Sequence, residues 1–201
     1  MEKKTLKKVD VIVAARVGHV AIGANMLFPK EEMRKGENNR KQSTRPVEGV
    51  DDSAYVNFTV GLVEALETLE KYDLPNPSNA TIYIGNSAYN AFMRYLNNVK
   101  VTRNSDTVQA IDLFVESKEG GMSEIEESLW RRVDELLSMD KFKGVTVRRA
   151  YSLSWVEAKL KDPKASSVDK NYAGLAQATW NELPEAQFDG FEIIEDESEA
   201  F

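Results

Sequence analysis

Residues 81–96 of this chain read TIYIGNSAYNAFMRYL. The apolar run TIYI predicts a strand, which stops at Gly85. After Gly85 the chain turns polar and an amphipathic pattern begins, which predicts a helix over 87–96. Many α/β enzymes place a carboxylate at the junction between such a strand and such a helix. Here the junction carries Asn86, whose side-chain amide has no charge.

Strand and helix patterns continue on both sides of this junction. Two apolar runs joined by Gly18 and His19 predict a hairpin, and Pro46 confines a third, short strand to a sheet edge. The expected strands are 9–17, 20–28, 40–47, 80–84 and 145–151, and the expected helices are 53–72, 87–96, 123–139 and 168–183. Residues 97–122 can be read as helix or strand, and a long loop is expected between 151 and 168.

The composition of the 201 residues indicates a globular protein, because 42% are hydrophobic and no apolar run is long enough to span a bilayer. The absence of cysteine excludes disulfides, thiolate metal sites and cysteine nucleophiles. His19 is the single histidine, so a serine triad would have one possible base. We expect a cytoplasmic protein without a signal peptide, a membrane contact or a cofactor.

The order of the expected elements is three antiparallel strands, a helix, and then strands that alternate with helices. Five segments carry this order: ALETL (65–69), IYIGNS (82–87), SLWRRVDELL (128–137), GVTVRRAY (144–151) and VDKNYAGLAQA (168–178). In pattern more than in identity, the chain resembles the ribonuclease H-like superfamily over 10–28 and 53–180. The resemblance implies an α/β fold with a mixed five-stranded sheet flanked by helices, and some other α/β sandwich with this element order is the alternative.

Enzymes of this superfamily cleave or join nucleic acids with two divalent cations that about four carboxylates hold. Two cations roughly 4 Å apart need several negative oxygens to be held together. The resemblance places the four acids at Ala14 or Ala15, Phe58, Asn86 and Asp169. Only Asp169 is acidic, and one carboxylate cannot hold two cations. The sequence therefore predicts no metal site and no nuclease activity.

Basic and aromatic residues predict a nucleic-acid interface instead. Residues 130–170 carry ten lysines and arginines against six acids, with Tyr151, Trp155 and Tyr172 among them, and a second basic segment covers 30–45. We expect RNA, or else single-stranded DNA, to contact Arg131, Arg132, Lys141, Lys143, Arg148, Arg149, Trp155, Lys159, Lys161, Arg40, Lys41 and Arg45.

We predict one domain over residues 1–183, with a charged loop or edge strand at 29–52, and an acidic tail over 184–201. The net charge is −7, and residues 181–201 hold eight acids and no lysine or arginine. Four apolar residues lie within the tail: Phe188, Phe191, Ile193 and Ile194. We expect the tail to solubilise the chain, to fold back on the basic surface and compete with nucleic acid, or to bind a protein partner.

Two other functions are compatible with these residues. The chain could be a protein-interaction scaffold or inhibitor, with Asn86 and Asp169 as ordinary turn or cap residues and each basic cluster as a solvated face. It could also be a metal-dependent nuclease that uses displaced carboxylates such as Asp10, Glu64 and Asp169. A small, cysteine-free protein with a decayed enzyme fold would suit a phage.

Overall fold

A computed structural model describes residues 3–50, 53–102, 110–118 and 121–184 of this chain. Its strands form one sheet in the order β3-β2-β1-β4-β5. The strands are β1 (Lys8–Arg16), β2 (His19–Leu27), β3 (Arg40–Glu48), β4 (Ala80–Ile84) and β5 (Thr146–Arg149). The α-helices are α1 (Ala54–Glu70), α2 (Asn86–Thr102), α3 (Ala110–Glu116), α4 (Glu124–Ser138), α5 (Leu153–Lys161) and α6 (Ser167–Asn181), and the 3-10 turns are Lys30–Glu32, Pro77–Asn79 and Asp140–Phe142.

The pairing of the strands gives a mixed sheet. β1, β2 and β3 pair in antiparallel fashion, whereas β4 pairs parallel to β1 and β5 pairs parallel to β4. β3 and β5 are the two edge strands, and the edge position of β3 explains how it tolerates Pro46. The predicted α/β fold with a mixed five-stranded sheet flanked by helices is confirmed.

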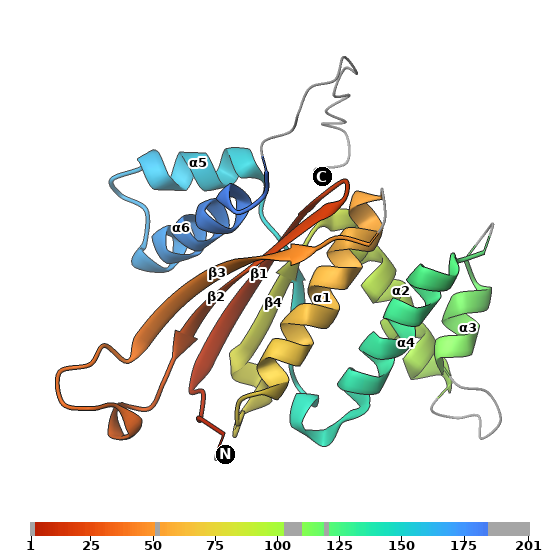
Figure 1. Cartoon of the computed structure of the whole chain (residues 1–201), viewed down its shortest axis with the longest axis horizontal. Coiled ribbons are helices and arrows are strands. Elements are labelled where there is room, and N and C mark those ends of the chain that lie inside the picture. The colour runs from red at the N-terminus through yellow and green to blue at the C-terminus, as the bar shows by residue number, and fades with distance from the viewer. Residues whose placement is uncertain (1–2, 51–52, 103–109, 119–120, 185–201) are drawn as a thin grey trace.

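Helices cover the two faces of the sheet unequally, with α1 to α4 on one side and α5 and α6 on the other (Figure 1). The strand residues alternate between these sides, so Val13 of β1 packs in the larger core with α1, whereas Ile12 packs with α6. Gly61 allows α1 to approach closely, because a Cβ there would lie 2.1 Å from Cγ1 of Val13. The β4–α2 junction therefore lies at the end of a sheet that has a helical layer on each face.

The prediction of a long loop between 151 and 168 is wrong, because α5 occupies most of this segment. Ser152 caps this helix, and its Oγ accepts a hydrogen bond from the backbone N–H of Trp155 at 3.3 Å. Val156 is the buried residue of α5, so the segment lacks the regular apolar stripe by which sequence patterns reveal a helix.

Other helices differ from their predicted bounds. Within 97–122, α2 continues to Thr102 and α3 forms a separate short helix. No described helix is long and apolar enough to cross a membrane. The predicted acidic tail lies outside the described residues from 185 onward.

Candidate functional site

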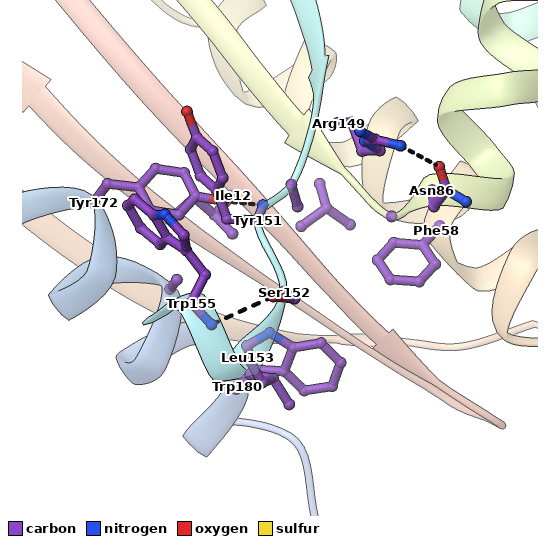
Figure 2. Close-up of a pocket in the computed structure, with 14 residues that line it drawn as sticks. Ile12, Phe58, Asn86, Arg149, Tyr151, Ser152, Leu153, Trp155, Tyr172 and Trp180 are labelled. Atoms are coloured by element: carbon purple, nitrogen blue, oxygen red, sulfur yellow. Dashed lines mark hydrogen bonds between the residues drawn. The ribbon is translucent and has the colours of Figure 1, made fainter. Parts of the chain in front are cut away.

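A cavity of about 410 Å³ opens where β4 ends, between α1 on one side and the α5–α6 pair on the other (Figure 2). Its volume falls within the usual range of ligand-binding clefts. The walls come from six parts of the chain: Ile12 and Val13 of β1, Phe58 of α1, Gly85 and Asn86 at the β4–α2 junction, Arg149 and Ala150 at the end of β5, the segment with Tyr151, Ser152, Leu153 and Trp155, and Tyr172, Ala176 and Trp180 of α6. None of these lining residues is acidic.

The β4–α2 junction forms the floor of the cavity beside Phe58. A Cβ on residue 85 would lie 2.6 Å from two carbons of the Phe58 ring, so only glycine fits at this position. Asn86 begins α2, and its Oδ1 accepts a hydrogen bond from Nη1 of Arg149 at 3.3 Å. The end of β4 thus presents an apolar ring and an amide to the cavity.

Aromatic side chains form the opposite wall. The rings of Tyr151 and Trp155 are stacked, with their centroids 4.2 Å apart and their planes at 14°. Tyr172 meets Tyr151 edge to face at 5.0 Å, and its hydroxyl accepts a hydrogen bond from the backbone N–H of Tyr151 at 3.1 Å. Tyr151 is 52% exposed, so the outer surface of this stack faces solvent.

Burial raises the pKa of Tyr172 to about 12; the backbone hydrogen bond from Tyr151 opposes this rise, and the neighbouring Tyr83 and Tyr151 add slightly to it. Its phenol therefore stays protonated and neutral near neutral pH. The pKa of Tyr83, which packs edge to face on Tyr172 at 4.8 Å, is raised chiefly by burial as well. The aromatic wall is accordingly uncharged, and the charge of the site comes from arginines.

Two arginines at the end of β5 supply this charge. Arg148 lies beside Tyr83 of β4 and Arg149 beside Ile84, so their side chains leave opposite faces of the sheet. Both are exposed, and neither forms an ion pair within the described part of the chain. Arg149 and Trp155 are the two predicted contact residues that line the cavity.

The predicted contacts on α4 lie elsewhere. α4 packs on α1, which covers the other face of the sheet from α5 and α6. Arg131 pairs with Glu127 and Asp112, and Arg132 pairs with Glu67 and Glu135. Carboxylates on both sides of each guanidinium neutralise its charge, so α4 presents a surface of mixed charge.

All but one of the remaining predicted basic residues also contact a neighbouring acceptor or aromatic ring. Carbonyl groups of Glu70 and Tyr72 accept hydrogen bonds from Lys141, whose pKa is lowered chiefly by burial. The other contacts are Lys143 with Asp140, Lys161 with Glu157, Lys159 with Asp169 and with the Trp155 ring, Arg45 with Glu64, and Lys41 with the Phe28 ring. Arg40 lies on β3, where it lines a second, smaller cavity.

The four positions at which the resemblance places acids lie apart in the structure. Phe58 and Asn86 line the cavity together, whereas Ala14 is buried near α6 and Ala15 belongs to the core on the α1 side. Asp169 lies in the first turn of α6 and is not among the cavity-lining residues. The interpretation of Asp169 as the cap of a helix, which the sequence suggested, is wrong.

Ser166 caps α6 in place of Asp169. The Ser166 hydroxyl accepts a hydrogen bond from the backbone N–H of Asp169 at 3.1 Å, and the Asp169 carboxylate lies 3.8 Å from Nζ of Lys159. An acid in the first turn also interacts favourably with the helix dipole. Local structure thus accounts for this carboxylate.

The displaced carboxylates do not converge either. Asp10 pairs with Lys8 at 3.4 Å, and Glu64 pairs with Arg45 at 2.7 Å. Glu64 belongs to α1, whereas Asp10 lies under α6 on the other face of the sheet. Within the described part of the chain, no group of three acidic or histidine side chains could hold a metal ion.

Two aromatic residues of this region were not predicted as parts of a site. Tyr83 lies on the face of β4 opposite Ile82 and Ile84, as the alternation of TIYI indicates. Trp180 follows Tyr172 by eight residues on α6, a spacing that returns to the same side of a helix. Both signals were present in the sequence, but only the packing of α6 on the sheet shows which cavities these rings face.

The sequence matches no family model and no curated protein. Among solved structures, the chain is similar to the RNase H domain of prototype foamy virus (PFV), with 14% identity, a TM-score of 0.44, and coverage of 89% of this chain and 93% of that one. It is also similar to the prototype foamy virus protease-reverse transcriptase, with 11% identity, a TM-score of 0.46 and coverage of 90% of this chain but 21% of the viral one. The strand order and the two helical layers are compatible with the resemblance to the ribonuclease H-like superfamily that the sequence carries.

Proposed function

We propose that this protein binds RNA or single-stranded DNA, without cleaving it, at the cavity beside the β4–α2 junction. One observation carries the proposal: the stacked rings of Tyr151 and Trp155 lie next to Arg148 and Arg149, which have no carboxylate partner among the described residues. A partly exposed aromatic platform beside unpaired cations is the combination that single-stranded nucleic acids require.

Each part of the cavity has a role in this proposal. An unpaired base stacks on the outer surface of Tyr151, which Trp155 supports from behind. Stacking of this kind contributes about 1–3 kcal/mol for each base. Arg149 contacts a neighbouring phosphate while it keeps its hydrogen bond to Asn86. The wall around Tyr172 carries no negative charge, so it does not repel the phosphates of the ligand.

The proposal excludes catalysis for a chemical reason. Phosphodiester cleavage by two cations needs carboxylate oxygens that hold both ions and clamp the phosphate between them. At the end of β4 the cavity has the Phe58 ring and the Asn86 amide, and no lining residue is acidic. The residues present therefore do not fit a pair of divalent cations.

Fluorescence anisotropy with labelled RNA and DNA oligonucleotides of the same sequence tests binding. We expect affinity for single strands, a preference for RNA, and a steep decrease with salt, with a log–log slope of about −0.7 for each phosphate contact. Duplex DNA of the same sequence is the control, because a duplex cannot stack its bases on Tyr151. Binding that does not depend on salt, or that favours the duplex, would contradict the proposal.

A protein-interaction function is the second candidate, and one observation favours it. Leu153, Leu160 and Val168 on the α5–α6 side are 44%, 37% and 71% exposed, respectively. Exposed apolar side chains that gather on one part of a surface often mark a protein contact. Failure of the unaltered protein to bind any oligonucleotide would favour this alternative.

A further inference from the structure

A second cavity, of about 160 Å³, lies under α6 on the same side of the sheet as Tyr83. Its polar lining includes Lys8 and Asp10 of β1, Arg40 of β3 and Asn171 of α6. Tyr172 lines both this cavity and the larger one. Because Tyr83 packs on Tyr172, a pair of aromatic rings stands between the two cavities.

The strip of sheet beside these rings is only partly covered. α6 packs against β1, β2 and β3, and on this side β4 and β5 present Thr81, Tyr83, Thr146 and Arg148. The first three side chains are partly exposed, and Arg148 is exposed. Two cross-strand rows result, Thr81 beside Thr146 and Tyr83 beside Arg148. This strip adjoins both cavities.

We infer that one nucleic-acid strand occupies both cavities, crosses the β4–β5 strip between them, and reaches Arg40 at its far end. The inference rests on the proposed function and extends it from one bound base to a site for several nucleotides. Arg149 lies one residue beyond Arg148, which is level with Ile12 across the sheet, whereas Arg40 is level with Lys8. The two arginines are therefore five residues of strand apart along the sheet, which is about 17 Å, and they also lie on different strands. A ligand much shorter than this distance cannot contact both arginines.

The charges along this path favour a phosphate backbone. Arg148 lies on the β4–β5 strip, and Arg40 lies at the far end without a carboxylate partner in the described residues. Asp10 is the one acid among the residues that line the second cavity, and Lys8 neutralises it at 3.4 Å. Asn171 adds an uncharged polar group. The strand would therefore meet positive or neutral groups over the whole path.

The length dependence of binding tests this inference. Two oligonucleotides, a trinucleotide and a dodecamer that contains it, are titrated against the unaltered protein and against the variants Arg40→Gln and Arg149→Gln. Arg94→Gln is the matched control, because Arg94 is exposed on α2 under the other face of the sheet. We expect Arg149→Gln to weaken the binding of both ligands. Arg40→Gln should weaken only the dodecamer, by about three- to fivefold, and should reduce the slope of its salt dependence by about 0.7.

The possible results separate the two proposals. If Arg40→Gln and Asn171→Ala bind the dodecamer as the unaltered protein does while Arg149→Gln is weakened, the inference is overturned and the proposed function stands. Equal weakening of the trinucleotide and the dodecamer by Arg40→Gln would also overturn the inference, because the effect would then not depend on reach. Absence of binding by the unaltered protein would overturn both.

Discussion

The phenyl ring of Phe58 presses against the backbone of Gly85, so that a single added carbon at residue 85 would come within 2.6 Å of the ring. This contact closes the floor of the cavity at the end of β4. It also fills the space beside Asn86 with hydrocarbon.

Gly85→Ala is expected to destabilise the protein by about 1–3 kcal/mol, because the Phe58 ring or the β4–α2 junction must move. Urea unfolding followed by circular dichroism measures the change. Gly174→Ala is the matched control, since nothing lies within 4 Å of a Cβ at this position in α6. Alanine in a helix interior should stabilise by about 0.5–1 kcal/mol. Equal effects of the two substitutions would mean that the contact with Phe58 is unimportant.

We expect no cleavage of RNA, an RNA–DNA hybrid or single-stranded DNA with Mg²⁺ or Mn²⁺, because the cavity offers no carboxylate. Restoring one acid by Asn86→Asp should not create activity, since two cations need several ligands. Cleavage is measured by incubating the protein with labelled substrates and separating the products by gel electrophoresis. Metal-dependent cleavage that is lost in Asp169→Ala would show that the active site lies elsewhere.

Trp155→Ala should weaken the binding of a single strand by about 1–3 kcal/mol, because Tyr151 loses the ring that holds its stacking surface in place. Tyr151→Phe should bind almost normally, since a phenyl ring stacks as a phenol does. Anisotropy titrations measure both variants, and circular dichroism shows whether they are folded. A loss of binding in Tyr151→Phe equal to that in Trp155→Ala would contradict a stacking role.

Arg148→Glu combined with Arg149→Glu should weaken binding and flatten its salt dependence, because two cations without a carboxylate partner in the described part of the chain become acids. The single substitutions assign the contacts, since the two side chains leave opposite faces of β5. Arg94→Glu, on α2, makes the same charge change away from the cavity and should bind as the unaltered protein does. Retained affinity in the double variant would remove β5 from the binding surface.

The free energy of unfolding should decrease as the pH rises from about 10 to about 12. Burial raises the pKa of Tyr172 in the folded protein to about 12, whereas the unfolded chain has the ordinary value near 10. Between these values the folded state binds more protons, so its stability is fully present below pH 10 and is lost above it. Chemical unfolding over this pH range measures the slope. Tyr172→Phe should make the slope shallower, while Tyr55 and Tyr95, whose pKa values burial also raises, maintain part of it.

Deletion of residues 186–201 should change the thermal midpoint by no more than a few degrees, because so acidic a segment is poorly suited to a packed core. If the tail competes with nucleic acid, the deletion should also increase affinity at low salt. Differential scanning calorimetry and the anisotropy titration measure these effects. A large decrease in the midpoint would mean that Phe188 and Phe191 pack on the domain.

The sequence predicted the sheet well because each strand carries a pattern that depends on its own residues. TIYI alternates between the two faces of β4, and Gly85 ends the strand where the chain must turn against Phe58. Such signals are local, and they placed Asn86 correctly at the start of a helix. The order of these elements, through the resemblance that it carries, then predicted a mixed five-stranded sheet, which the structure has.

The charges of the site could not be predicted in the same way, because their partners are distant in the sequence. Arg132 looks like part of a basic cluster, but Glu67, 65 positions away, accepts a hydrogen bond from it. Arg131 likewise meets Asp112, which is 19 positions away. A run of basic residues shows how many charges a segment carries, but only the fold shows which of them are neutralised.

The helix α5 contributes one buried side chain, Val156, to the domain, and is otherwise held by the partly buried Trp155 and by the Lys159–Asp169 ion pair. An element with so little buried apolar surface opens at a small cost in free energy, well below that of global unfolding. Each opening of α5 would carry Trp155 away from Tyr151 and leave the cavity accessible along its whole length. A single nucleic-acid strand could then enter the cavity from the side, at any position along its own length. A covalently closed circular strand has no free end to thread into the cavity. It should therefore associate with the protein as fast as a linear strand of the same length.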